Sequence, residues 1–301
     1  MQFSNVVEDS NNSNKKLYLG LENFSVTAFN PTMAELNDMG INVTEEPVYN
    51  TKVKRDFGDG EKEYDAVNLR FYLSNHDSNN PIKTQVNYQV VRSYPTSSSG
   101  KTKCINKYGT VVWMEDSYLN TGTVPANYQH WYVNEGVHKC YRGEDTFVQF
   151  LKAFLNLPTV KIDSNNDIKT KGLANIDQSD WDKLFAGNFT EIRKIIHEAG
   201  DAGKLGFLLG VRTLEDGRQV QALFASSPLK RYVKSMGENA YLVKDVANAQ
   251  ANGAYSTVIF DLDNLVLREF DPDTDMVTPD DDFPGIPVTM DTEEDHDDLP
   301  F

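Results

Sequence analysis

The last 33 residues of this 301-residue chain constrain its fold most, because they hold nearly all of its net charge. From Glu269 to Phe301 there are 13 acidic residues and no Lys or Arg, in a chain whose formal net charge is −16. A segment of like charges with several prolines and little to bury cannot offset the entropy that ordering costs. We therefore expect a disordered acidic tail over residues 269–301, a folded body over 15–268 and a flexible arm over 1–14.

The composition of the whole chain is that of a soluble protein with a sizeable core. About 39% of the residues are apolar and 11% are aromatic, which is enough for a core, and a length of 301 residues allows one large or two ordinary domains. No stretch reaches the ~18 consecutive apolar residues of a membrane span, and the N-terminal residues lack the basic and apolar regions of a signal peptide. The only cysteines, Cys104 and Cys140, make no disulfide framework. We expect a cytoplasmic protein without a membrane partner.

Alternating apolar and polar residues predict short antiparallel strands in the body. Within residues 82–90, every second side chain from Ile82 to Val90 belongs on one face, and Asp216-Gly217 favours a tight hairpin turn. Six or more such strands fit a mainly β (α+β) fold, an OB-like antiparallel barrel with helical insertions. The predicted strands cover residues 17–29, 66–73, 82–90, 205–214, 218–224, 255–260 and 265–268.

Capping residues and apolar spacing predict three helical regions. Thr32 and Glu35 form a capping box for a short helix from Met33. A longer helix begins near Glu144 and has its apolar side chains at helical spacing, so it should pack firmly on the sheet. Further helical stretches lie in an insertion near residues 161–204.

A span without carboxylates is the main candidate for a binding site. Residues 81–114 contain five basic and no acidic residues, in a chain with 45 acidic residues. Cations that follow phosphates, together with aromatic faces that stack bases at ~1–3 kcal/mol each, suit single-stranded nucleic acid. Alternatively, the aromatic residues fill the core and the lysines form a solvated face. The candidate DNA contacts are Lys83, Tyr88, Arg92, Tyr94, Lys101, Lys103, Lys107, Tyr108 and Trp113, with a second group at Lys230, Arg231 and Tyr232.

The C-terminal tip combines carboxylates with an apolar end. Its sequence is Asp297-Asp298-Leu299-Pro300-Phe301, and an aromatic ring can bury in a pocket while a basic rim holds the carboxylates. This tip resembles that of single-stranded DNA-binding proteins, in which an acidic tail recruits replication and repair enzymes. The resemblance implies that these five residues bind a partner such as a polymerase, helicase, primase or recombinase. A solubilising tail that ends in Phe by chance is the alternative.

Motifs in the first half of the chain resemble a more specific group of such proteins. The segments Leu17-Tyr-Leu-Gly-Leu21, Phe29-Asn-Pro-Thr32, Lys107-Tyr-Gly109 and residues 141–157 are similar to single-stranded DNA-binding proteins of large tailed bacteriophages, including crAss-like phages. The resemblance does not extend over residues 161–253. It implies an OB-like barrel that coats single-stranded DNA during replication, recombination and repair in the cytoplasm of a bacterial host.

Sequence motifs for enzymatic chemistry are missing. The chain has no phosphate loop, dinucleotide-binding glycine motif, zinc-protease motif or nucleophile elbow. We therefore expect a protein without enzymatic activity or cofactor. Two rivals remain open: an acidic-tailed interaction protein, either a DNA mimic or a scaffold, that does not touch nucleic acid, and a nuclease that uses Asp261 and Asp263.

Two groups of residues have some features of metal sites. Cys104, His130, His138 and Cys140 could supply four zinc ligands, but structural sites usually leave two to four residues between neighbouring ligands, more than separate His138 from Cys140. Residues 271–275 carry alternate carboxylates, but lack the glycine and the distal glutamate of a calcium loop. We expect no metal at either place.

Overall fold

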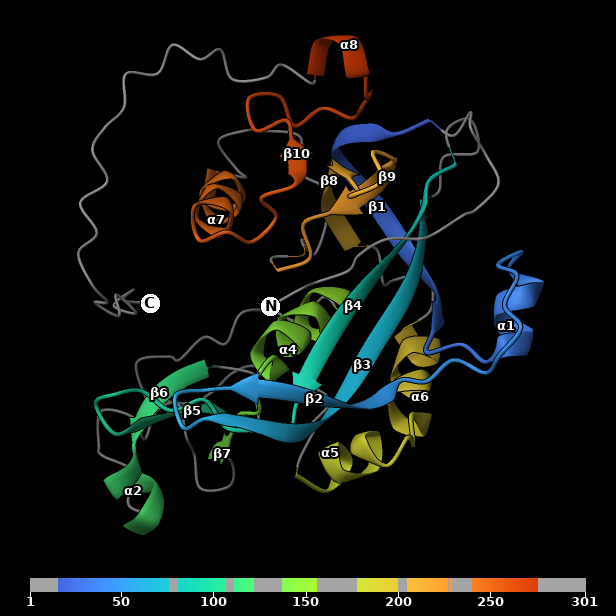
Figure 1. Ribbon diagram of the computed structural model, residues 1–301. Coiled ribbons are helices and arrows are strands. Elements are labelled where there is room, and N and C mark those ends of the chain that lie inside the picture. Colours follow the sequence, from blue (N-terminus) through green and yellow to red (C-terminus); the bar gives the residue numbers. More distant parts are fainter. Residues whose placement is uncertain are drawn as a thin grey trace, which may run out of the picture.

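Two antiparallel sheets dominate the computed structural model of the chain (Figure 1). The larger sheet has eight strands and the smaller has three, which confirms the prediction of a mainly β chain. The structure describes residues 16–75, 81–106, 111–121, 137–155, 178–199, 205–226, 228 and 240–275.

The larger sheet is built around β1 and β3, which run antiparallel to each other. Its strand order is β10-β8-β1-β3-β2, and β4, β9 and β11 pair with β3, β8 and β1. The predicted turn joins β8 to β9 at Gly217, whose φ of 80° suits glycine. The strands are β1 (Tyr18–Phe29), β2 (Asn50–Asp56), β3 (Glu61–Asn75), β4 (Lys83–Val91), β8 (Leu205–Thr213), β9 (Gln219–Leu223), β10 (Val258–Phe260) and β11 (Arg268–Glu269).

The larger sheet curls around its core without closing. The hydroxyl of Tyr88 in β4 donates to the carbonyl oxygen of Ala225, just after β9, over 3.1 Å. No strand ladder joins β4 to β9 within the described residues. The predicted antiparallel architecture is therefore present, whereas a closed barrel is not found in the described part of the chain.

The smaller sheet lies beside the hairpin of β2 and β3 (Figure 1). It consists of β5 (Lys101–Asn106), β6 (Val111–Glu115) and β7 (Val137–Lys139), in the order β6-β5-β7. Helix α2 (Asp116–Thr121) follows β6 directly. Lys101–Asn106 and Val111–Glu115 thus belong, together with β7, to a sheet separate from the larger one.

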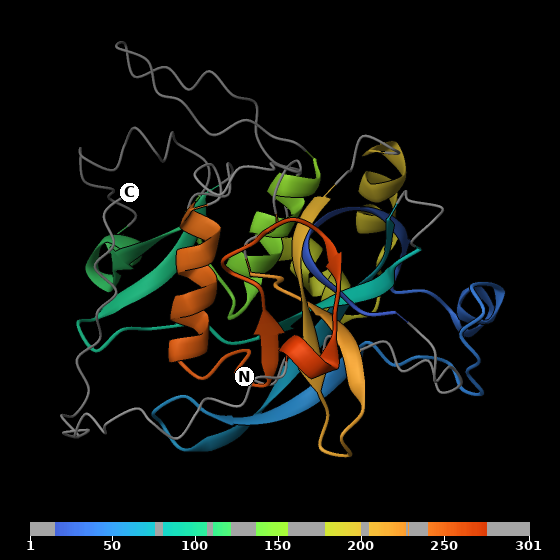
Figure 2. The same ribbon diagram turned by 90° about the horizontal axis from the view of Figure 1, so that it is seen from above.

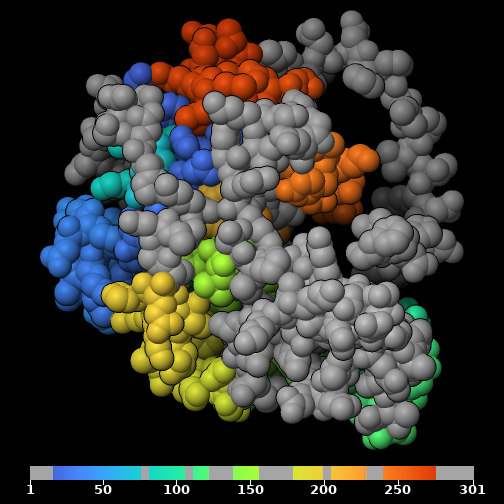
Figure 3. All heavy atoms as spheres, turned by 180° about the vertical axis from the view of Figure 1, so that it is seen from behind, coloured from blue at the N-terminus to red at the C-terminus, as the bar shows by residue number. Residues whose placement is uncertain are grey.

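One face of β3 and β4 is covered by three helices, α4 (Glu144–Phe154), α5 (Gln178–Phe185) and α6 (Thr190–Ala199). The ring centroids of Phe71 and Phe150 are 4.3 Å apart in this core, and Trp181 is fully buried. Helices α5 and α6 belong to the predicted insertion, of which residues 161–177 and 200–204 lie outside the described part. The insertion therefore completes the main core. Figure 3 shows α5 and α6 in yellow at the rear surface.

Two other helices confirm or extend the predictions. Helix α1 (Met33–Asp38) has the predicted capping box, in which the Thr32 hydroxyl and the Glu35 carboxylate each accept a backbone N–H of the other residue. Helix α7 (Ala240–Ala251) packs on the other side of β1 and β8, where Leu242 and Leu21 belong to a second apolar cluster. Figure 2 shows α7 in orange, apart from α4 in green.

The folded body continues beyond its predicted end at Arg268. Glu269 pairs with Tyr18 in β1, and Phe270 is only 7% exposed. The Arg268 guanidinium bonds to the Asp275 carboxylate with both terminal nitrogens, over 2.7 and 2.8 Å, at the end of α8 (Pro272–Asp275). The prediction that the tail begins at Glu269 is therefore wrong, because a backbone pairing, a buried ring and an ion pair hold residues 269–275. Residues 276–301 and the arm over 1–14 lie outside the described part.

Two truncations test this boundary. We expect a chain ending at Arg268 to lose at least about 3 kcal/mol of unfolding free energy, because it loses the buried ring of Phe270 and leaves its pocket open. A chain ending at Asp275 retains these contacts and should unfold at the same denaturant concentration as the full chain. Urea unfolding followed by tryptophan fluorescence measures both. Equal stability of the two truncated chains would contradict the new boundary.

Candidate nucleic-acid interface

The predicted DNA contacts are distributed over two sheets. Lys83 and Tyr88 belong to β4, Lys101 and Lys103 to β5, and Trp113 to β6. Arg92 and Tyr94 follow β4 in the connection to the smaller sheet. The other candidates lie outside the described residues, namely Lys107, Tyr108, Lys230, Arg231 and Tyr232, together with Asp297, Asp298, Leu299, Pro300 and Phe301 at the tip.

Tyr88 is a core residue. Its side chain is 2% exposed, and its ring lies 5.1 Å from that of Phe150 between centroids. Burial raises the pKa of its hydroxyl well above the usual value. The prediction that Tyr88 stacks on a base is therefore wrong, because its side chain is on the side of β4 that packs against the helices.

Arg92 already has protein partners. Its guanidinium pairs with Asp182 in α5 and lies 4.0 Å from a carboxylate oxygen of Asp65. It also lies 5.4 Å from the ring centroid of Phe185. These contacts tie the end of β4 to α5. They leave Arg92 poorly placed as a phosphate ligand, because a phosphate would have to displace two carboxylates.

Lys101, Lys103 and Trp113 do share a surface. Lys103 is paired with Trp113, and Lys101 with Glu115, across β5 and β6, so all four residues lie on one face. The Lys103 ammonium is 5.6 Å from the Trp113 ring centroid, but also 3.0 Å from the Asp145 carboxylate in α4. The predicted cation–aromatic pair is present, and its charge is already matched by a carboxylate.

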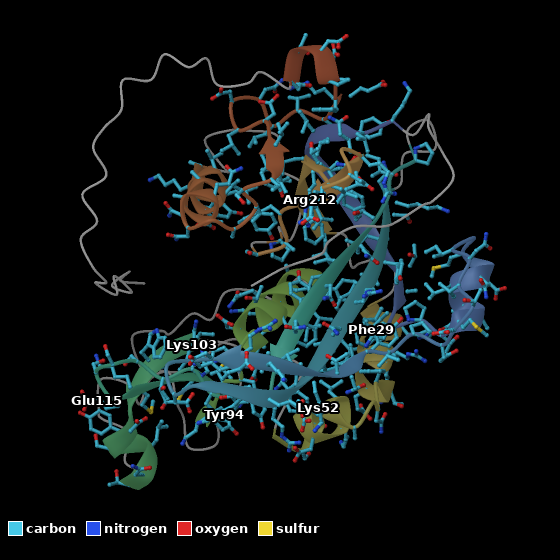
Figure 4. The ribbon with its side chains drawn as sticks, viewed as in Figure 1. Phe29, Lys52, Tyr94, Lys103, Glu115 and Arg212 are labelled. Carbon is cyan, nitrogen blue, oxygen red and sulfur yellow. The ribbon has the colours of Figure 1, made fainter. Side chains whose placement is uncertain are left out.

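Tyr94 lies in a second cation–aromatic group. Its ring stacks on Tyr141, with centroids 4.8 Å apart and an interplanar angle of 12°, and the Lys139 ammonium lies 5.8 Å from its centroid. Lys139 pairs with Cys104 of β5, so it is on the opposite face of the smaller sheet from Lys103. Figure 4 shows Tyr94, Lys103 and Glu115 in the same part of the molecule. The two groups are neighbours, but they do not form one continuous positive channel.

The sequence did not predict that Lys139 lies beside Tyr94. It belongs to β7, which has only three residues, so it has too few residues for an alternating pattern to stand out. Its place beside Tyr94 depends on the pairing of β5 with β7. No local signal could have revealed this contact.

A buried carboxylate holds the smaller sheet against the helices. Glu144 is 0% exposed. Its Oε1 accepts the indole N–H of Trp181 over 2.9 Å and lies 2.8 Å from Nε2 of His138, while Oε2 accepts the backbone N–H of Tyr141 over 2.7 Å. Buried polar groups of this kind persist only when such bonds satisfy them. The sequence indicated only that a helix begins near Glu144.

The structure places no group of three or more metal-ligating side chains together within its described residues. His130 lies outside that part of the chain, and Nε2 of His138 is hydrogen-bonded to the Glu144 carboxylate. Burial raises the pKa of the Cys104 thiol to about 11, and that of Cys140 further still. Both thiols are therefore protonated at neutral pH, the form in which they bind metals poorly.

The acidic residues near the end of the body also have structural partners. Asp261 pairs with Arg268 over 2.8 Å, and its other oxygen accepts the backbone N–H of Asn264. Within residues 271–275, Asp271 accepts the N–H of Asp273 in the first turn of α8. Both oxygens of Asp261 are therefore bonded within the body, one of them to Arg268, which argues against a pair of catalytic metal ligands at Asp261 and Asp263.

No described helix is both long and apolar enough to cross a membrane.

The buried thiols give a prediction about pH. A pKa raised to about 11 leaves roughly one thiolate in a thousand at pH 8 for Cys104, since each pH unit below the pKa lowers the thiolate fraction tenfold. We expect both cysteines to resist alkylation by iodoacetamide in the folded protein at pH 8 and to react at once in denaturant. Mass spectrometry counts the modified thiols. Fast reaction of the folded chain would contradict the burial.

Substitution of the buried carboxylate gives a second prediction. We expect Glu144→Ala to cost about 3 kcal/mol of unfolding free energy or more, because it strands the N–H groups of Trp181 and Tyr141 in the interior. Asp145→Ala is the matched control in the next residue, where a partly exposed ion pair is worth about 1 kcal/mol or less. Urea unfolding of both variants decides. Similar losses in the two would show that the network is unimportant.

Comparison of the chain with protein-family models, curated proteins and solved structures finds no match. The function therefore has to be inferred from the sequence and from the geometry described above.

Proposed function

We propose that the chain is a non-enzymatic single-stranded DNA-binding protein of a bacteriophage. On this proposal it coats exposed strands during DNA replication, recombination and repair, and its tip from Asp297 to Phe301 recruits a replication protein. The observation that supports this function is the separation of charge along the chain. Thirteen acidic residues and no basic ones follow Arg268, whereas residues 81–114 contain five basic and no acidic ones.

The carboxylate-free span supplies what a phosphate backbone requires. Much of its described part forms β4, β5 and β6, so Lys83, Lys101 and Lys103 stand on strands. Trp113 and Tyr94 are each partly exposed beside a lysine ammonium, and such pairs can accept a base on the ring and a phosphate on the cation. Contacts of this kind bind without reading sequence.

The acidic tail has two roles in this proposal. It competes with DNA for the cations of the body, because both are polyanions. When DNA displaces the tail, the apolar end of the tip becomes available to a partner, whose basic rim would hold Asp297 and Asp298. DNA binding and partner recruitment are thereby linked.

A second candidate function has specific support. Lys103 and Arg92 are paired with carboxylates of the body, as expected of an acidic-tailed interaction protein that does not itself bind nucleic acid. The two functions differ in whether the body has affinity for a bare strand. A nuclease has weaker support, because Asp261, one of its two expected metal ligands, forms an ion pair with Arg268.

Titration with labelled oligonucleotides tests the proposed function. We expect fluorescence anisotropy to show binding to oligo(dT) in preference to duplex DNA, with affinity falling by about 10- to 100-fold between 50 and 200 mM salt as counterions are released. A chain ending at Asp275 should bind more tightly at low salt, because the competing carboxylates are gone. No binding by either chain would favour the interaction protein.

A further inference from the structure

A second surface of the larger sheet has the composition of a polyanion site. The alternating pattern of β2, β3 and β4 puts one set of side chains against α4, α5 and α6 and the other set on the opposite side. We call this opposite side the outer face. It consists of every second residue of β2 from Thr51, of β3 from Lys62 and of β4 from Lys83. Because α5 and α6 are at the rear, the outer face points toward the viewer of Figure 1.

Carboxylates are segregated from the outer face. None of its positions on β2, β3 or β4 is Asp or Glu. All the acidic residues of these three strands occupy the alternate positions, namely Asp56, Glu61, Glu63 and Asp65. In a chain with 45 acidic residues, this one-sided distribution leaves the outer face positive.

Cations follow one another along this face. Lys83 and Arg70 lie at positions four residues apart along β4, since Arg70 pairs with Asn87. Arg142 adds a third cation another four residues on, because it forms a bridge with Val91. At ~3.3 Å per residue, successive cations are separated by roughly 13 Å along the strands.

Most cations of this face form no ion pair within the described residues, although the Asp59 carboxylate is close enough to Arg142 to interact with its charge. No ion pair forms there at Arg55, Arg70, Lys83 or Arg142, and Lys62 alone pairs with a carboxylate, that of Asp59 in the hairpin turn. The cations of the outer face thus form fewer ion pairs than the central lysine of the smaller sheet, Lys103, which is paired with Asp145. Unmatched positive charge on a rigid sheet attracts a polyanion.

Aromatic and amide groups lie between the cations. The Arg142 guanidinium is 3.8 Å from the ring centroid of Phe57, which in turn lies 5.2 Å from that of Tyr64. Asn68 Oδ1 accepts the amide N–H groups of Gln89 over 3.2 Å and Asn87 over 3.3 Å.

Several polar atoms of the outer face remain unsatisfied. The Asn87 Oδ1, Arg70 Nε and Arg142 Nε atoms have no hydrogen-bond partner within the described part of the chain. Buried polar atoms usually have one. These three atoms are buried, so they would reach a ligand only if the side chains around them moved.

We propose that the outer face of β2, β3 and β4 is the docking surface for a single-stranded polynucleotide, which runs along β3 and β4. This inference rests on the proposed function and names the site that performs it. The cations bind successive phosphates, while the rings and amides contact unpaired bases. The smaller sheet then plays a lesser part, because its central lysine already has a carboxylate.

Paired charge reversals on full-length protein test the site. Arg55→Glu with Lys83→Glu reverses two exposed cations of the outer face. Lys54→Glu with Lys244→Glu is the control, because it makes the same change in net charge at two exposed lysines elsewhere, one of them adjacent to Arg55 but on the other face of β2. Anisotropy with oligo(dT) is measured at two salt concentrations, and urea unfolding checks that all variants fold.

The outer-face variant should bind oligo(dT) at least tenfold more weakly at low salt, with a salt slope smaller by about 1.4, as for two lost phosphate contacts to a single strand. The control should change affinity less than threefold. Equal losses in both variants, or wild-type affinity in the outer-face variant, would overturn the site while leaving the function intact. If the unaltered protein fails to bind oligo(dT), the function itself fails.

Discussion

The burial of one side of β3 and β4 against three helices is the constraint on which the rest of the structure depends. Phe71 and Tyr88 from these strands pack with Phe150 of α4, and Trp181 of α5 belongs to the same cluster. Because a strand alternates its side chains, fixing the apolar set inward also fixes which residues face outward. The polar set that includes Asn68 therefore lies on the opposite side, where Asn68 is half-buried.

Local features of the sequence predicted the elements well. The capping box of α1, the apolar spacing of α4 and the Asp216-Gly217 turn each depend on residues within a few positions of one another. The antiparallel pairing follows from alternation of the same short range. Such signals survive because tertiary contacts reinforce the local preference.

Contacts between distant residues were what the sequence could not reveal. The neutralisation of Lys103 by Asp145 and the burial of Phe270 depend on how strands pair, as does the open edge between β4 and β9. Charge counts along the chain found the carboxylate-free span, but not which face each cation occupies. The candidate site could therefore be predicted as a stretch of residues and not as a surface.

The position of Glu144 has a mechanical consequence. One carboxylate joins His138 of the smaller sheet and the backbone of Tyr141, both within six residues of it, to Trp181 of α5, which is 37 residues further along the chain. Removing any one of them leaves a polar group without its partner in an interior that solvates it poorly. The small sheet and the helical layer are thereby coupled, and a displacement of β7 has to be accompanied by an adjustment of α5.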